Sequence, residues 1–283
     1  MGSIFNYNSL VHATAGASGS VFAMTCFYPL DNVKFRMQLD DKELLDKSTF
    51  QAIVYLIKRE GIEALYRGIK PVITTIGVSN FVYFYAFHGF KSLLPKYLES
   101  SKTDLLLSIA AGVVNVLFTT PLWVVNSRLK FPEEVLYSGL LDGLFHIAST
   151  EGVGALWNSL GPSLILVSNP AIHFTVYESL KRRVTVKSAT AFFILGALSK
   201  TVATIITYPL QLAQTRQRLT KDPNISTAAL LLMILKKNGP GALYQGLESK
   251  MLQTVLTAAL MFMTYEKIAQ TVFRIMLRNS SKH

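Results

Sequence analysis

Lys200 is the only charged residue in a long apolar stretch, residues 188–215. A lone lysine inside a membrane segment is costly to bury, and where one occurs it usually serves a function. Its ammonium group offers three hydrogen-bond donors and a full positive charge, so it could bind an anion. The alternative is a structural lysine whose long stem carries the charge to the membrane surface. We predict a solute-binding or gating role for Lys200.

A second group of charges follows a proline in the segment YPLDNVKFR. Its acid and base, Asp31 and Lys34, are three residues apart, so on a helix they could pair with each other or with charges on other helices. The pattern recurs as TPLWVVNSR and YPLQLAQTR, each with an arginine seven residues after the proline. The prolines are 92 and 88 residues apart, at Pro29, Pro121 and Pro209.

Two further segments repeat in phase with the prolines. EGIEALYRG, EGVGALWNS and NGPGALYQG are spaced by 91 and 87 residues, and FHGFK, YESLK and YEKIA by 90 and 88. Three independent segments share one period, which is typical of a chain built from internal repeats. The sequence therefore predicts three homologous units, with bounds at 1–95, 96–187 and 188–283.

The composition is that of a membrane protein. Half of the 283 residues are hydrophobic, the mean hydropathy is +0.34, and 16% are charged, against about a quarter in soluble domains. Each predicted span needs about 20 apolar residues. Six runs qualify, the last three less clearly: 71–90, 105–127, 152–177, 13–30, 188–215 and 251–265.

Each unit is predicted to contain two membrane helices joined by a short amphipathic surface helix. We expect the surface helices at 48–59, 138–149 and about 225–236. Proline inside a membrane helix usually kinks it, so the first helix of each unit should bend at Pro29, Pro121 or Pro209.

Several classes of protein are disfavoured. The net charge is +11, but the basic residues stand in short clusters between apolar runs, which argues against nucleic acid as a partner. No basic segment precedes the first apolar run, so no cleavable signal peptide is expected. A single cysteine excludes an internal disulfide, and the five histidines show no metal-ligand spacing. We find no phosphate-loop or nucleophile motif and expect neither an enzyme, a bound metal nor a resident cofactor.

The triple signature resembles that of the mitochondrial carrier family. The resemblance covers essentially the whole chain. It implies an all-α membrane protein, in which six transmembrane helices in three pseudo-symmetric repeats form a helical barrel with three short surface helices. It also implies transport by alternating access through a central cavity, with a gate on each side and a single chain as the functional unit.

The inner gate implied by the resemblance is depleted of charge. Asp31 and Lys34 match the family's acid and base, but Trp123 and Asn126 stand in the second repeat and Gln211 and Gln214 in the third. The family's glutamine brace is matched by Gln38, whereas Lys130 and Arg218 occupy the other two places. We expect Trp123 to plug this side, and fewer ion pairs to make each gate easier to open.

The outer gate is also incomplete. Its aromatic-acid-base pattern is whole only in the second repeat. The residues assigned to it are His88, Lys91, Glu178, Lys181 and Glu266.

The solute is expected to touch Lys200 and the second helix of each repeat. Lys200 precedes Gln211 by 11 residues, roughly three helical turns, so both should lie on one side of the helix. The resemblance adds three contact positions, Thr75, Ile165 and Gln253. Asn80 and Tyr83, in the aromatic segment SNFVYFYAF, could hydrogen-bond to or stack on a base. Asn115 and Asn169 could serve either the solute or helix packing.

At finer grain, segments such as AGVVNVLFTTPLWVVNSRLK and MLQTVLTAALMFMTYEK resemble the peroxisomal branch of the family. That resemblance implies exchange of coenzyme A, FAD, NAD, AMP, ADP or ATP, all of them anionic solutes, across the peroxisomal membrane. The alternative is a mitochondrial inner-membrane carrier of a nucleotide, folate or related anion. The basic stretch 181–187 could bind a receptor for peroxisomal membrane-protein import, or simply mark one side of the membrane. The remaining expected partner is membrane lipid.

Overall fold

The computed structural model describes residues 7–39, 43–44, 47–95, 100–131, 137–183, 189–220, 225–257 and 260. Every regular element in this part of the chain is a helix. The chain divides into two compact units, which we describe separately. Unit 1 contains Met1–Val33, Ser48–Tyr66 and Glu248–His283, and unit 2 contains Lys34–Lys47 and Arg67–Leu247. Helix α1 (Tyr7–Gln38) contributes to both.

Unit 1 combines α1, α2 (Thr49–Glu60), the 3-10 helix η1 (Ile62–Tyr66) and helical residues 248–257. Ser48 starts α2 through a capping box, in which its hydroxyl and the Gln51 side chain each satisfy the other residue's backbone N–H. Tyr28, which precedes the first signature proline, stacks on Tyr66 with ring centroids 6.2 Å apart. The Asn32 amide donates to the carbonyl of Ala64 at 2.8 Å. These contacts fix the end of α1 against η1.

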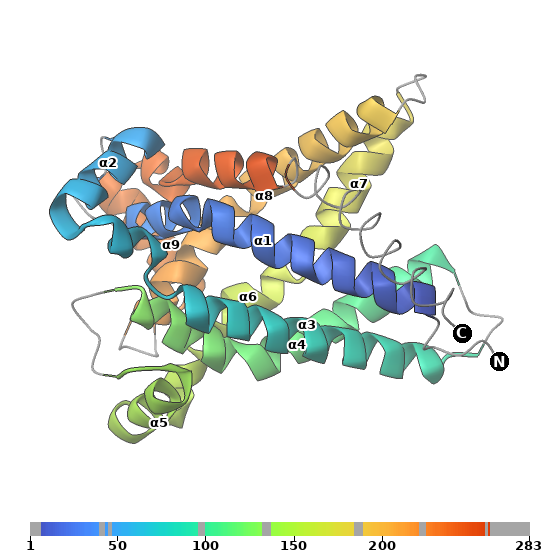
Figure 1. The fold of residues 1–283 in the computed structure, drawn as a ribbon, viewed down its shortest axis with the longest axis horizontal. Helices are drawn as coiled ribbons and strands as arrows, with labels where there is room; N and C mark the ends of the chain where they lie inside the picture. The colour runs from blue at the N-terminus through green and yellow to red at the C-terminus, as the bar shows by residue number, and fades with distance from the viewer. Residues whose placement is uncertain are drawn as a thin grey trace, which may run out of the picture. The chain divides into compact units, whose positions relative to one another are not determined.

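Unit 2 is built on three long helices, α3 (Ile69–Ser92), α4 (Ser101–Leu129) and α8 (Ala189–Leu219). Helix α3 runs beside α4, and α7 (Asn169–Lys181) runs beside α8 (Figure 1). Asn115 and Ser79 exchange hydrogen bonds of 3.0 and 3.1 Å between α4 and α3. Asn169 donates to the Thr207 hydroxyl at 2.9 Å, which joins α7 to α8. Both asparagines therefore serve helix packing.

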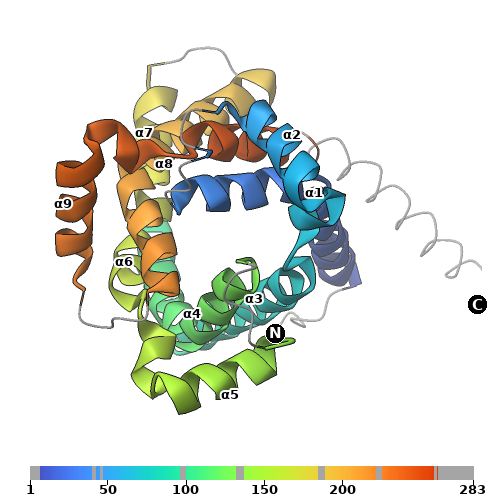
Figure 2. The same ribbon diagram turned by 90° about the vertical axis from the view of Figure 1, so that its left-hand side faces the viewer.

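The predicted surface helices are present. In unit 2, α5 (Leu140–Thr150) lies against α4 and α9 (Thr227–Asn238) lies against α8 (Figure 2). Each is followed by a 3-10 turn, η4 (Val153–Trp157) or η5 (Pro240–Tyr244). With α2 in unit 1, the three helices agree with the expected ranges to within about two residues. Ser48 and Ser226 cap α2 and α9, whereas the residue before α5 is Gly139, and an apolar face follows in each helix.

Pro29, Pro121 and Pro209 lie inside helices α1, α4 and α8, which continue past them. Proline has no N–H, so it leaves the carbonyl four residues earlier without its helical partner. For Pro121 that carbonyl belongs to Leu117, and the Trp157 indole N–H donates to it at 2.9 Å. Trp157 of η4 thus supplies the hydrogen bond that Pro121, in the same repeat, cannot donate. The kinks themselves stay a prediction.

The apolar run 152–177 forms two helices where the sequence predicted one membrane segment. Helix α6 (Leu160–Leu166) ends two residues before α7 begins. Pro170 stands in the first turn of α7, where it is tolerated, but it has no N–H to donate to the carbonyl of Leu166, four residues earlier, so the α-helical hydrogen-bond pattern is interrupted here. The Ser168 hydroxyl donates to the Ile165 carbonyl at 2.7 Å and satisfies one acceptor at the break.

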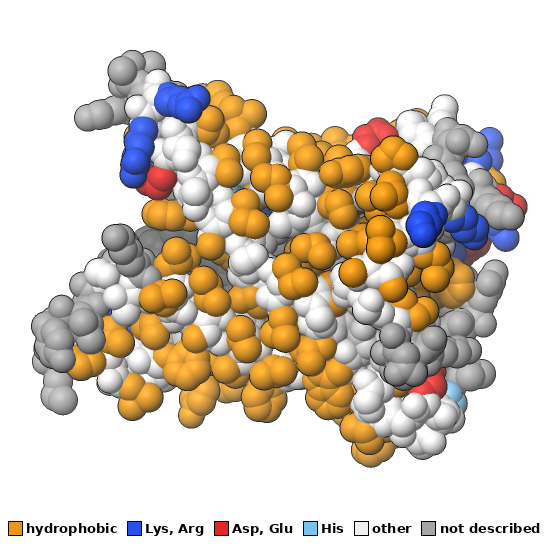
Figure 3. All heavy atoms as spheres, turned by 180° about the vertical axis from the view of Figure 1, so that it is seen from behind, with side chains coloured by type: hydrophobic (Ala, Val, Ile, Leu, Met, Phe, Trp, Pro, Cys, Tyr) orange, Lys and Arg blue, Asp and Glu red, His pale blue; other side chains and the backbone are white. Residues whose placement is uncertain are grey.

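The apolar surface of these helices is largely exposed. Within the described residues, one helical segment, Thr103–Leu129, is both long and apolar enough to cross a membrane, and only 22% of its most apolar window is buried. Hydrophobic side chains cover much of the face seen in Figure 3. Such surface suits contact with lipid rather than water.

Gly143 provides a test of the packing of α5 on α4. A Cβ atom there would overlap Val125 Cγ1 and lie 2.7 Å from the Tyr137 ring. Gly143→Ala should therefore cost about 1–3 kcal/mol through overpacking, which exceeds the roughly 1 kcal/mol gained in helix propensity. We expect a lower apparent Tm for the purified protein. Gly154→Ala, whose Cβ meets nothing within 4 Å, is the matched control; equal behaviour of the two variants would contradict the packing described.

Candidate functional site

Gln38 links the end of α1 to α8 in unit 2. Its amide nitrogen donates to the Tyr208 hydroxyl at 3.1 Å, and its amide oxygen accepts from Thr215 at 2.9 Å. Arg216 donates to the Gln38 backbone carbonyl at 2.8 Å and to the Gln245 side chain at 3.2 Å. Gln38 is 1% exposed. The residue predicted to brace the inner gate therefore makes buried bonds between the first and third repeats.

Arg128 joins α4 to the end of α8. Its guanidinium binds both carboxylate oxygens of Glu151, at 2.5 and 2.9 Å. It also donates to the backbone carbonyls of Arg218 at 3.1 Å and Thr220 at 3.3 Å. The Asn158 amide donates to the same Thr220 carbonyl at 2.8 Å. The second repeat thus satisfies the carbonyl groups that end α8, which the helix cannot satisfy itself.

The signature positions of the second and third repeats carry neutral side chains in varied settings. Trp123 lies under the Arg218 guanidinium, 5.4 Å from the ring centroid. Gln211 donates within α8 to Thr207 at 3.1 Å, and Gln214 donates to Ser163 of α6 at 2.8 Å. Asn126 is 1% exposed, and neither polar atom of its amide has a hydrogen-bond partner among the described residues. Polar and aromatic contacts thus surround these positions, as expected, and the role of Trp123 as a plug stays a prediction.

Replacing Asn126 and Asn115, which both lie on α4, by leucine should change the thermal stability in opposite directions. An unpaired buried amide costs about 1–3 kcal/mol, so Asn126→Leu should raise the apparent Tm of the purified protein. Asn115→Leu leaves Ser79 without its partner and should lower the Tm. Thermal unfolding of both variants, followed by tryptophan fluorescence, tests the pair. A fall in Tm for Asn126→Leu would show that its amide is satisfied in the protein.

In unit 1, the gate residue Asp31 contacts the predicted solute residue Gln253 directly. The Gln253 amide nitrogen donates to an Asp31 carboxylate oxygen at 3.4 Å. Gln253 is 6% exposed, and its amide oxygen has no partner within the described ranges. Asp31 and Lys34 are both half-buried. Two residues that the sequence analysis assigned to different roles are thus hydrogen-bonded to each other, and both roles stay predictions.

Lys200 lies on α8 with its side chain exposed. Within the part of the chain that the structure describes, its ammonium makes neither a hydrogen bond nor an ion pair. Gln211 lies 11 residues further along the same helix, which corresponds to about 16 Å of axial rise. An exposed ammonium at this position can bind an incoming anion without first breaking a bond to the described part of the protein.

The other predicted solute residues are less uniform. Thr75 is fully buried, and its hydroxyl donates to the Pro71 carbonyl of its own helix at 2.8 Å. Ile165 is 52% exposed at the end of α6. Asn80 is exposed. Tyr83 stacks on Phe87 with centroids 6.4 Å apart, so part of its ring serves packing.

The outer-gate residues pair locally in unit 2. Lys91 forms an ion pair of 2.9 Å with Asp104, in the first turn of α4. Glu178 and Lys181 form a 3.5 Å pair within α7, and His88 is exposed. Glu266 lies outside the described residues. The structure thus supplies Lys91 with an acid that the sequence reasoning missed, although Asp104 follows the helix-start residue Ser100 in the sequence.

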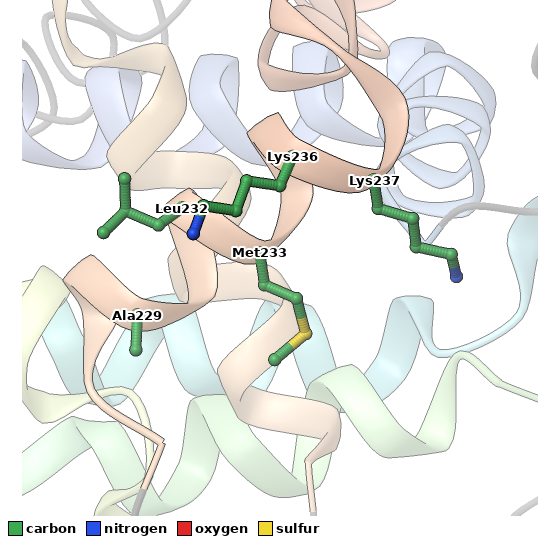
Figure 4. Close-up of a pocket in the computed structure, with 5 residues that line it drawn as sticks. All are labelled: Ala229, Leu232, Met233, Lys236 and Lys237. Atoms are coloured by element: carbon green, nitrogen blue, oxygen red, sulfur yellow. The ribbon is translucent and has the colours of Figure 1, made fainter.

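Two pockets in unit 2 lie away from these residues. One, of about 460 Å³, lies against α9 and is lined by Ala229, Leu232, Met233, Lys236 and Lys237 (Figure 4). The other, of about 610 Å³, lies between α3 and α4 and is lined mainly by Phe81, Tyr85, Phe90 and Phe118. Neither contains a predicted solute residue, so the charge and placement of Lys200, rather than these apolar pockets, indicate the functional site.

Comparison with known proteins agrees with the repeat pattern. The family model for mitochondrial carrier protein matches residues 5–98, 99–188 and 185–275. The chain is similar to peroxisomal membrane protein PMP34 of Mus musculus, at 46% identity over the full length of both chains. It is similar to peroxisomal adenine nucleotide carrier 1 of Glycine max, at 33% identity over 95% of this chain and 93% of that one.

A third relative is the peroxisomal nicotinamide adenine dinucleotide carrier of Arabidopsis thaliana, at 28% identity over 97% of this chain and 99% of that one. The triple signature, the all-helical repeats and these matches agree with one another. The chain therefore belongs to the mitochondrial carrier family.

Proposed function

We propose that this protein exchanges adenine nucleotides and adenine-containing cofactors across the peroxisomal membrane. The expected solutes are coenzyme A, FAD, NAD, AMP, ADP and ATP. Two of the relatives are peroxisomal carriers named for an adenine nucleotide and for nicotinamide adenine dinucleotide. We infer that the protein moves these compounds unchanged and uses no resident cofactor.

The observation that carries the proposal in this structure is the accessible ammonium of Lys200 on α8. All the proposed solutes carry phosphate groups, for which a lysine provides a point charge. Aromatic and amide side chains near α3, including Tyr83 and Asn80, would meet the base. Gln253, which donates to Asp31 within unit 1, stays a predicted solute contact.

The peroxisomal assignment has support in the repeated segment that begins as EGIEALYRG in the first repeat. The resemblance implies aromatic-base-glycine sites that help to bind cardiolipin, and only Tyr66-Arg67-Gly68 is complete. The second and third copies have Asn158 and Gln245 in place of the base. In this structure both instead make protein contacts, Asn158 to Thr220 and Gln245 to Arg216. A membrane without cardiolipin would allow that change.

Transport by the purified protein in liposomes tests the proposal. Liposomes loaded with AMP should take up labelled coenzyme A, NAD, FAD or ATP faster than liposomes without internal nucleotide. Liposomes made with and without cardiolipin should perform alike. Failure to exchange any adenine compound would reject the proposed solutes, whereas a strict requirement for cardiolipin would favour the mitochondrial alternative.

A further inference from the structure

We propose that Gln38, Lys130 and Arg218 form a latch that holds the signature ends of the helices together, in place of the ion pairs that the signatures lack. These ninth-position residues each stand nine places after a signature proline. The inference rests on the proposed carrier function only in that closing and opening serve transport. All the residues of the latch belong to unit 2.

Each ninth-position residue contacts the preceding repeat in cyclic order. Gln38 of the first repeat bonds to Tyr208 and Thr215 of the third, at 3.1 and 2.9 Å. The Lys130 ammonium of the second repeat lies 5.3 Å from the centroid of the Phe35 ring in the first.

Arg218 completes the cycle between the third repeat and the second. Its guanidinium lies over Trp123 and donates to the Ser159 hydroxyl at 3.3 Å. The aromatic residue at the second signature's acid position therefore has a cation as its partner. Gln38 and Lys130 are 1% and 7% exposed, so water competes little for their contacts.

The seventh-position arginines, Arg36, Arg128 and Arg216, run the cycle in the other direction. Arg128 of the second repeat donates to the backbone carbonyl of Arg218 in the third, at 3.1 Å. Arg216 of the third repeat donates to the carbonyl of Gln38 in the first, at 2.8 Å. The Arg36 guanidinium of the first lies 5.7 Å from the Phe131 ring centroid in the second.

This double cycle explains how the closure tolerates neutral signatures. A cation over an aromatic ring away from water is attracted more strongly than a solvent-reached ion pair, and it is screened less by salt. The two cations at ninth positions occur in the second and third repeats, whose signatures have lost both acid and base. The first repeat has the signature acid and base, Asp31 and Lys34, and its ninth-position residue is the neutral Gln38.

The test is the accessibility of position 126 to a maleimide in the purified full chain, which requires no transported solute. The background is Cys26→Ser with Asn126→Cys, because Asn126 is 1% exposed whereas Cys26 is exposed. Adding Lys130→Gln and Arg218→Gln keeps hydrogen-bonding groups but removes both cations. We expect labelling to accelerate by about tenfold.

Three comparisons keep the test decisive. Arg183→Gln removes an exposed charge at the end of α7 and should leave labelling unchanged. Arg218→Lys keeps a cation at position 218, so its labelling should stay slower than that of Arg218→Gln. Trp123→Leu should accelerate labelling as much as Arg218→Gln does, and the two changes together should accelerate it no further. Amide hydrogen exchange is measured on the same latch variants made without the Asn126→Cys change. Exchange should become faster at the C-terminal ends of α4 and α8 and stay unchanged in α3. Unchanged labelling and exchange in the double-glutamine variant would overturn the latch, even if adenine exchange is observed.

Discussion

Lys200→Gln is expected to reduce uptake of adenine nucleotides into loaded liposomes by about 10–100-fold. A hydrogen bond to a charged group contributes about 1.5–3 kcal/mol, and tenfold in affinity corresponds to about 1.4 kcal/mol. The glutamine keeps the length and polarity of the side chain but loses the charge. Because the Lys200 ammonium makes no hydrogen bond or ion pair within the described residues, the change should leave the fold intact.

The controls for Lys200 separate binding from stability. Lys200→Arg keeps the charge and should retain part of the activity, with a raised KM for the solute. Arg183→Gln, at an exposed site on the end of α7, should transport normally. The apparent Tm of all three variants should match that of the parent protein. Normal transport by Lys200→Gln would remove Lys200 from the solute path and leave it as a structural lysine.

Arg128→Met is expected to lower stability by about 3–5 kcal/mol, the usual result of removing one member of a buried ion pair. Arg128 is 3% exposed and its partner Glu151 is 18% exposed. The substitution leaves the Glu151 carboxylate without its cation and the Arg218 carbonyl without the Arg128 donor, whereas the Thr220 carbonyl keeps its bond from Asn158. The apparent Tm should fall by about 10 °C, at roughly 2–4 °C for each kcal/mol.

Two further variants distinguish this buried pair from an ordinary surface pair. Lys91→Met breaks the Lys91–Asp104 pair, whose side chains are 37% and 44% exposed, and should cost about 1 kcal/mol or less. In the double variant Arg128→Met, Glu151→Met no charge is stranded, so the loss should be smaller than for Arg128→Met alone. A Tm for Arg128→Met as high as for Lys91→Met would show that water reaches the pair.

Local patterns in the sequence predicted most of the helical framework. Capping serines begin α2 and α9, and an apolar face marks α2, α5 and α9; both features are visible in short segments. The break between α6 and α7 was missed because a 26-residue uncharged run suggested one span. The signal was present in Pro170, whose missing N–H interrupts the helical hydrogen bonds inside the apolar run.

The candidate site was harder to predict because its contacts join residues far apart in the chain. The period placed Gln38, Lys130 and Arg218 at equivalent positions, but it could not show that the two cations face Phe35 and Trp123. The sequence shows that Arg128 and the segment EGVGALWNS, which begins with Glu151, both belong to repeated patterns. No local pattern shows that Arg128 and Glu151 form an ion pair. Lone charges, such as Lys200, stand out in a sequence, whereas pairwise geometry does not.

The interruption between α6 and α7 divides the last apolar segment of the second repeat into two helices that contact different neighbours. Helix α6 contacts both α4 and α8, whereas α7 packs along α8. Gln214 and Ser163 hold α6, and Asn169 and Thr207 hold α7. At the joint, the Val167 and Ser168 N–H groups bond to the carbonyls of Leu164 and Ile165, three residues earlier instead of four, so the α-helical hydrogen-bond pattern changes there. Motion on one side of the membrane therefore need not be transmitted rigidly to the other side through this segment.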